Sequence, residues 1–127
     1  MQPPRRQGTE YEDLAADFLI RQGMTIITRR ARAKGGELDL VALDGDELVF
    51  VEVKMRRAGV GPELAISREK GLRIQSAAKS YIHEHLIDRP FRYDVIAFAG
   101  SQVRHHKGVF LDFAELKSNP NDEFEAY

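Results

Sequence analysis

Two carboxylates and one amine lie close together in the middle of the sequence, on either side of a short turn. Asp39 precedes the turn Asp44-Gly45-Asp46-Glu47, while Glu52 and Lys54 follow it. In an extended strand, side chains two residues apart share one face at a spacing of about 6.6 Å, so Glu52 and Lys54 are expected to point the same way. Acidic oxygens beside an amine are suited to holding a divalent cation against a phosphodiester.

The length of the turn decides whether the two carboxylates meet. A turn of even length places Asp39 opposite Glu52 and Glu37 opposite Lys54. Like charges directly opposite each other destabilise a sheet, and partial burial increases that cost. We therefore expect a cation between Asp39 and Glu52, while Glu37 either forms an ion pair with Lys54 or holds it in place.

The expected cation is Mg²⁺ or Mn²⁺. Mg²⁺ is bound through one or two carboxylates, with waters and substrate phosphate oxygens completing its coordination. In such a site the ion activates and orients a water for attack on phosphorus. Lys54 then positions this water or stabilises the negative charge that develops on the phosphate.

A charged tripeptide such as Glu52-Val53-Lys54 is common on the exposed face of a hairpin and indicates little alone. Its surroundings are more informative because the strand is apolar on both faces, which is typical of a buried strand. The charges thus stand at the end of a buried strand, where a rim or pocket is expected. The apolar side chains are Val49, Val51 and Val53 on one face and Leu48 and Phe50 on the other.

Hydrophobic spacing and turn residues define the elements that must position this group. Thr9 and Glu12 form a capping box at the start of a helix that Gly23 ends. Ser67 caps a second helix, and Pro90 ends that segment. We expect the order α-β-β-β-α-β-β: a helix over 9–22, a strand over 24–28, a basic loop over 29–36, strands over 37–43 and 48–54, a helix from Ser67, a strand over 91–98 and an edge strand over 102–106.

The net charge of −1 does not by itself indicate a nucleic-acid-binding protein. The distribution of charge is more informative, because basic residues gather before the hairpin, after it and in the second helix. We expect them to contact phosphates, with a solvated surface as the alternative. They are Arg29, Arg30, Arg32 and Lys34 in the basic loop, Arg56 and Arg57 after the second hairpin strand, and Lys70 and Arg73 in the second helix.

The length of 127 residues predicts a single domain, which we place over 9–118, between a flexible N-terminus over 1–8 and a frayed acidic tail over 119–127. There is no cysteine, which excludes disulfides and thiolate zinc sites and favours the reducing cytoplasm. No apolar run is long enough to cross a bilayer, so no membrane association is expected.

Three further polar residues are predicted to have roles outside the site. Asp94 follows Tyr93 in the late strand and is expected to be buried against a basic partner such as Arg73, in a structural role. His105 and His106 are adjacent, so they face opposite sides of a strand and cannot easily bind one metal together. We expect them at the surface.

A resemblance to a known family covers most of the chain and is most specific in the hairpin. The hairpin resembles that of the small bacterial YraN family of predicted endonucleases, which is related in pattern to archaeal Holliday-junction resolvases and to the PD-(D/E)XK nucleases. The matching residues are Gly36-Glu37-Leu38-Asp39-Leu40-Val41-Ala42 and Leu48-Val49-Phe50-Val51-Glu52-Val53-Lys54, followed by Arg56.

The resemblance implies that Asp39 and Glu52 are metal ligands, that Lys54 is the catalytic lysine and that Glu12 supplies a further acidic contact. It also implies an α/β, restriction-endonuclease-like fold with a central mixed sheet flanked by helices, and it is compatible with a homodimer. Leu38 stands where the name of the superfamily has proline. For Glu12 a capping role toward Thr9 is the alternative, and the complete capping box favours it.

The function that follows is a divalent-metal-dependent endonuclease acting on nucleic acid, DNA in preference to RNA, with branched or single-stranded DNA as candidate substrates. Two alternatives remain open. One is a nucleic-acid-binding module that keeps the fold without catalysis. The other is a structural or interaction protein whose hairpin charges only support the fold.

Overall fold

The predicted hairpin forms, and its turn has the expected even length. In a computed structural model of the protein, Leu43 pairs with Leu48 and Asp44 pairs with Glu47. Two residues, Gly45 and Asp46, are left for the turn, and Gly45 supplies the positive φ (61°) that a tight hairpin needs. The hairpin strands are β2 (Gly36–Asp44) and β3 (Glu47–Arg56). The structure describes residues 8–56, 64–109, 115–116 and 123–126.

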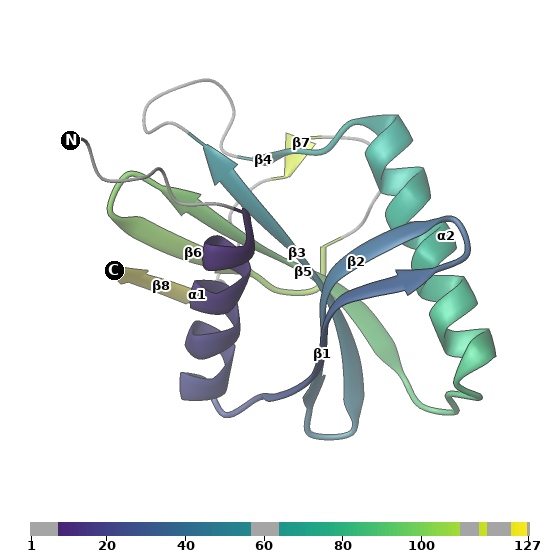
Figure 1. The fold of residues 1–127 in the computed structure, drawn as a ribbon. Helices are drawn as coiled ribbons and strands as arrows, with labels where there is room; N and C mark the ends of the chain where they lie inside the picture. Colours follow the sequence, from purple (N-terminus) through teal and green to yellow (C-terminus); the bar gives the residue numbers. More distant parts are fainter. Residues whose placement is uncertain (1–7, 57–63, 110–114, 117–122, 127) are drawn as a thin grey trace.

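This hairpin lies within a six-stranded mixed sheet of order β1-β2-β3-β5-β6-β8 (Figure 1). β5 is the one strand parallel to its neighbour β3 within this described sheet, and parallel partners require a long crossover, which contains helix α2. A separate pair of short strands, β4 and β7, lies outside the large sheet. The remaining bounds are β1 Thr25–Ala33, β4 Leu64–Ala65, α2 Arg68–Glu84, β5 Phe91–Ala99, β6 Gln102–His106, β7 Glu115–Leu116 and β8 Glu123–Ala126.

Helix α1 (Gly8–Arg21) and helix α2 cover opposite faces of the sheet, and each buries one apolar side. At the end of α1, Gly23 has a φ of 91°, its N–H bonds to the carbonyl of Ile20, and Met24 N–H bonds to that of Leu19. This is a Schellman motif. At the start of α2, the Ser67 side chain accepts a hydrogen bond from the N–H of Lys70, as predicted.

Two buried clusters therefore form, one between the sheet and each helix. The α1 cluster includes Ala15, Phe18 and Leu19 with Leu40, Val49 and Ile96 of the sheet. The α2 cluster includes Ile74, Ala77 and Tyr81 with Val41, Phe50 and Val95. Apolar residues on both faces of β2 and β3 are thus buried, which confirms the prediction of a buried hairpin. The α/β, restriction-endonuclease-like fold is also confirmed, with the predicted element order and three added short strands.

The predicted basic loop over 29–36 is wrong, because β1 continues to Ala33 and pairs with β2 along its length. Only Lys34 and Gly35 are left for the turn. This turn packs closely on α2: a Cβ added to Gly35 would lie 2.2 Å from Oγ of Ser76. The basic side chains of this segment are therefore held on an edge strand and not on a flexible loop.

The predicted surface role of the two adjacent histidines is also wrong. His105 is 0% exposed and His106 is 1% exposed. Their strand, expected at the edge, lies between β5 and β8, because Glu123–Ala126 forms a strand where a frayed tail was expected. The expected flexible N-terminus lies outside the described residues apart from Gly8. Within the described part of the chain, no helix is long and apolar enough to cross a membrane.

Asp94 is buried and structural in its contacts, but its basic partner is not Arg73. Its carboxylate accepts hydrogen bonds from Arg92 (Nε, 2.9 Å), from Nε2 of His105 (2.7 Å) and from the backbone N–H of Gly108 (2.9 Å). Arg73 instead lies 3.6 Å from Glu69 on its own helix. Burial alone would raise the pKa of Asp94, but the hydrogen bonds from His105 and Arg92 hold it below its usual value.

The same Arg92 guanidinium also reaches the turn of the β2–β3 hairpin. Its Nη1 lies 2.7 Å from Oε1 of Glu47, and its Nη2 lies 2.9 Å from Oδ2 of Asp44. These two acids flank the turn residues Gly45-Asp46. One half-buried cation therefore fastens the hairpin turn to β5.

Candidate active site

Asp39 and Glu52 come together where the ladder between β2 and β3 ends. The last paired residues are Leu40 and Val51. Beyond them, Oδ2 of Asp39 accepts a hydrogen bond from the backbone N–H of Val53 at 2.8 Å, and the carboxyl groups of Asp39 and Glu52 hydrogen-bond each other. The even turn therefore brings the two acids together, as the sequence predicted.

The alternation of side chains along β2 is interrupted next to Asp39. Leu38 and Val41 both belong to the α2 cluster, whereas Leu40 belongs to the α1 cluster. Strict alternation would place Leu38 with Leu40 and opposite to Val41. The alternation of side chains between the two faces of the sheet is therefore broken between Leu38 and Val41, and Asp39 lies at this break.

Because of this position, Asp39 interacts with charges from both helices. It raises the pKa of Glu12 on α1, where burial is the larger cause, and Lys70 on α2 opposes the rise in its own pKa. Glu37 of β2 adds a further negative charge near both Glu12 and Asp39. The site is thus an acidic group between the two helices, at the edge of both cores.

Burial makes this acid pair resist ionisation. Burial and, after it, the neighbouring Asp39 raise the pKa of Glu52 to about 8, against the opposing effect of Lys70. Burial also raises the pKa of Asp39, although the Val53 N–H and the hydrogen bond with Glu52 act in the other direction. The raised pKa of Glu52 therefore favours a proton on the pair near neutral pH.

A cation from α2 completes the described group. Nζ of Lys70 lies 3.1 Å from Oε1 of Glu52. Lys70 belongs to the first turn of α2, directly after the Ser67 cap, so the helix start fixes its backbone. The sequence placed Lys70 only among phosphate contacts, because an ion pair between a helix and a strand depends on how the crossover packs.

A pocket of about 310 Å³ opens beside Glu52 and Lys70. One wall is the start of β2, and the other is the first part of α2. The close packing of the Lys34-Gly35 turn on α2 holds these walls together. The lining residues are Gly36, Glu37, Glu52, Lys70, Arg73 and Ile74.

The predicted ladder pair of Glu37 and Lys54 does not form, because the β2–β3 ladder stops before both residues. Glu37 instead lies 3.6 Å from Arg32 of the neighbouring strand. Lys54 is half-buried two residues beyond Glu52, in register with Ala97 of β5. Both residues remain close to the acid pair along the chain, but they are not cross-strand partners.

Glu12 contacts Arg30 of β1, beside the site. Helix α1 begins at Gly8, so Thr9 lies inside the helix and is not its N-cap. Oε2 of Glu12 lies 3.5 Å from Nε of Arg30. Burial and, after it, the neighbouring Asp39 raise the pKa of Glu12. The favoured capping role is therefore wrong, and Glu12 joins the acidic group.

The basic residues of β1 lie along this acidic group. Arg30 pairs with Glu12 and Arg32 pairs with Glu37, while Arg29 forms an ion pair and hydrogen bond with Asp13 of α1. Lys34 is exposed at the neighbouring turn. Arg56 ends β3 without a described side chain, and Arg57 lies outside the described residues.

The acidic pair suits Mg²⁺ or Mn²⁺ better than a metal that needs a full protein cage. Among the described residues, no group of three or more histidine, aspartate or glutamate side chains is arranged to hold a metal ion. Two adjoining carboxylates are sufficient for Mg²⁺, which keeps several waters and takes phosphate oxygens. The raised pKa values of Asp39 and Glu52 are consistent with such an ion, because a bound cation would offset the cost of ionising the two carboxyl groups.

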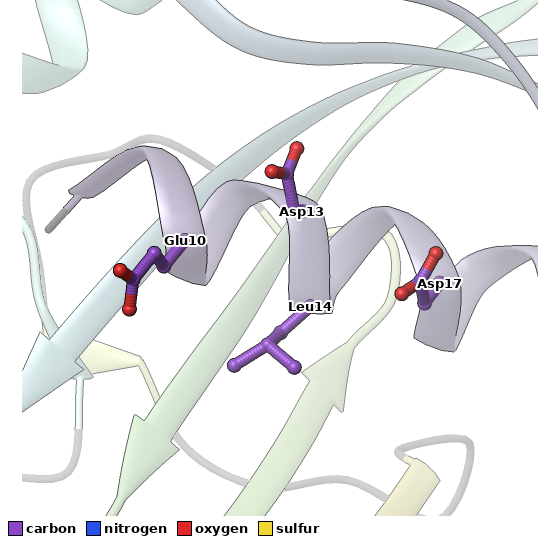
Figure 2. Close-up of a pocket in the computed structure, with 4 residues that line it drawn as sticks. All are labelled: Glu10, Asp13, Leu14 and Asp17. Carbon is purple, nitrogen blue, oxygen red and sulfur yellow. The ribbon is translucent and has the colours of Figure 1, made fainter. Parts of the chain in front are cut away.

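A second acidic hollow, also of about 310 Å³, lies on the outer side of α1. Figure 2 shows Glu10, Asp13 and Asp17 projecting from the helix in different directions, with Leu14 pointing toward the strands. Their carboxylates do not converge on a common point. This hollow therefore differs from the Asp39–Glu52 site, in which two carboxyl groups meet.

Comparison with known proteins agrees with the resemblance seen in the hairpin. A family model described as "Uncharacterised protein family UPF0102" matches residues 11–98, which include all four site acids and Lys70. A UPF0102 protein of Pseudomonas putida is 43% identical, over 83% of this chain and 86% of its own. A relative from Thermotoga neapolitana is 40% identical over 79% and 94%, and one from Vibrio cholerae 39% over 86% and 88%.

Proposed function

This chain belongs to UPF0102, the uncharacterised YraN family, and we propose its function from the arrangement of its own side chains. The protein is a divalent-metal-dependent nuclease that hydrolyses phosphodiester bonds of nucleic acid, with DNA preferred to RNA. The observation that carries this proposal is the hydrogen-bonded pair of Asp39 and Glu52, buried at the rim of the sheet beside Lys70. A purely structural acid pair would be costly to bury in this way.

In the proposed mechanism, Asp39 and Glu52 hold Mg²⁺ or Mn²⁺. The Val53 N–H fixes the direction of the Asp39 carboxylate before any ion arrives, so little reorganisation is needed. A bound Mg²⁺ or Mn²⁺ supplies a Lewis acid and lowers the pKa of a water at the phosphate. Lys54, two residues beyond Glu52 in the chain, would stabilise the negative charge that develops on the phosphate. Glu12 and Glu37 add negative electrostatic potential around the pair.

The cations of β1 and α2 give the nucleic acid a place to bind. Arg30 and Arg32 lie beside site acids, and Lys70 and Arg73 line the pocket. These cations would offset the negative charge of the acidic group and attract the phosphates that approach the site. Contacts of this kind fix the position of the backbone and read no sequence.

The decisive experiment combines cleavage with metal binding. Labelled branched, single-stranded and duplex DNA and matched RNA are incubated with Mg²⁺ or Mn²⁺, and Mn²⁺ binding is followed by calorimetry. Asp39→Asn and Glu52→Gln should abolish both signals while circular dichroism shows an intact fold. Asp17→Asn, an exposed acid of the α1 hollow, is the matched control and should change neither. Absence of cleavage together with equal heats for wild type and Asp39→Asn would overturn the proposal.

A non-catalytic nucleic-acid-binding module on the same fold is the second candidate. It is favoured by the absence, among the described residues, of a third side chain able to ligate with the pair. This candidate predicts binding that weakens with salt, is unchanged by a chelator and leads to no cleavage. Chelator sensitivity of binding or of cleavage decides between the two.

A further inference from the structure

Lys70 occupies a distinctive position in the site. Its ammonium lies 3.1 Å from a Glu52 oxygen, while Glu52 also hydrogen-bonds Asp39. The ammonium therefore stands beside one of the two carboxylates that would bind a metal ion. The Glu52 side chain is 11% exposed, whereas that of Lys70 is 42% exposed. One partner is therefore mostly buried, and the other is partly exposed to solvent.

The contacts of the neighbouring cations differ from those of Lys70. Arg73, one turn further along α2, lies beside Glu69. Arg30 and Arg32 approach Glu12 and Glu37, which lie around the pair and are not part of it. Among the cations with described ion pairs, Lys70 is thus the one that contacts a member of the acid pair itself.

We infer that Lys70 is a tethered counter-cation of the acid pair, which leaves Glu52 when a divalent ion binds and then contacts a phosphate of the bound nucleic acid. This inference rests on the proposed function. The pocket beside Glu52 gives the ammonium a place to move, because Lys70 itself lines it. Lys70 is a positioning residue: it acts on the metal through Glu52 and on the substrate through a phosphate.

Electrostatics make the inference measurable without activity. An ammonium near Glu52 repels a divalent ion about twice as strongly as it repels a proton, because the interaction scales with charge. Removing the ammonium therefore strengthens metal binding more than it strengthens competition from the proton. A residue that only supported the local structure would have the opposite effect, since its loss would loosen the site.

The test compares Mn²⁺ affinity, measured by calorimetry at fixed pH, for wild type, Lys70→Met and Lys79→Met. Lys79 is an exposed lysine on the same helix and serves as the control. Lys70→Met should bind Mn²⁺ about tenfold more tightly than wild type. The same variant should cleave DNA more slowly at saturating Mn²⁺, and Lys79→Met should match wild type in both.

Each outcome separates this inference from the proposed function. Equal or weaker Mn²⁺ binding by Lys70→Met, with wild type binding normally, overturns the role of Lys70 and leaves the nuclease proposal standing. If neither wild type nor Lys70→Met binds Mn²⁺, the role of Lys70 and the nuclease proposal are both overturned. Tighter binding without loss of cleavage supports the counter-cation role and removes the phosphate contact. Lys70→Arg keeps the charge, so its Mn²⁺ affinity should stay near that of wild type.

Discussion

The backbone N–H of Val53 donates a hydrogen bond to Oδ2 of Asp39 over 2.8 Å, beyond the last ladder pair of β2 and β3. A side chain thus replaces the backbone acceptor that a longer ladder would provide. This bond satisfies a half-buried N–H and at the same time fixes the direction of a proposed metal ligand. The same carboxylate therefore contributes to the fold and is the proposed metal ligand.

Substitutions of Asp39 should separate these two roles. Asn keeps an oxygen acceptor for Val53, so Asp39→Asn should stay within about 1 kcal/mol of the wild-type free energy of unfolding. Ala leaves that N–H unsatisfied, so Asp39→Ala should lose about 1–3 kcal/mol. Urea denaturation measures both. Equal losses in the two variants would show that the hydrogen bond is not what Asp39 contributes to the fold.

Glu52 should make the metal-free protein less stable as the pH rises. Its pKa is raised from 4.5 to about 8 by burial and by Asp39, so between these values the folded state holds a proton that the unfolded state has released. Stability then falls with pH across this window, by on the order of 1–4 kcal/mol. Glu52→Gln should flatten this profile, and exposed Glu84→Gln should not. A flat wild-type profile from pH 5 to 8 would contradict the raised pKa.

Mg²⁺ should stabilise the protein, and more so at higher pH. An ion that binds only the folded state adds about 2.7 kcal/mol at one hundred times its dissociation constant. Because a proton on the acid pair competes with the ion, the rise in melting temperature should be larger at pH 8.5 than at pH 6.5. Asp39→Asn should show no rise at either pH. A rise of equal size in that variant would place the ion elsewhere.

Gly35 should be among the most sensitive glycines, because two independent effects act on it. Its φ is 101°, and an added Cβ would lie 2.2 Å from Oγ of Ser76. Gly35→Ala should therefore lose about 2–4 kcal/mol. Gly45→Ala has a positive φ but open space around it, so it should lose only about 1 kcal/mol.

A double-mutant cycle isolates the contact at Gly35. If the Ser76 side chain causes the steric part, Gly35→Ala combined with Ser76→Gly should cost less than the two single variants together. Additive costs would show that backbone strain alone is responsible. Thermal unfolding of the four proteins gives the result.

Asp94 should contribute stability that is present at neutral pH and lost in acid. Its pKa is held below its usual value by His105 and Arg92 despite burial, so the contribution disappears as the pH falls below about 4. Asp94→Asn should lose about 2–4 kcal/mol at pH 7, since it leaves buried donors poorly paired. Arg73→Met, which does not touch this network, should change stability by less than about 0.5 kcal/mol.

Local patterns were enough to predict the hairpin, the end of α1 and the start of α2. The even turn at Gly45-Asp46, the Ser67 cap and the Gly23 stop are each decided by residues a few positions apart. Turn parity predicted the convergence of Asp39 and Glu52, although the ladder itself stops one pair before them. Local sequence therefore determined which two acids meet.

Features that depend on distant packing were missed. Lys70 reaches Glu52 from the crossover helix, and His105 is buried against Asp94 of β5 and Phe18 of α1. Arg30 was placed in a loop, yet the pairing of its neighbours Arg29 and Ala31 with β2 keeps this segment in a strand. In each case, pairing or packing between segments far apart in the sequence decided the outcome.

The guanidinium of Arg92 is fastened to both acids that flank the β2–β3 turn and also to Asp94. An extra residue in this turn would displace Asp44 relative to Glu47 and break their shared contacts with Arg92. It would also place Asp39 on the opposite face of the sheet from Glu52. Hairpin turns ordinarily tolerate changes in length. Here the length of the turn sets the register of β2 against β3, and with it the position of Asp39 relative to Glu52 at the other end of the strands. Variation in chain length among functional relatives should accordingly fall in other connections.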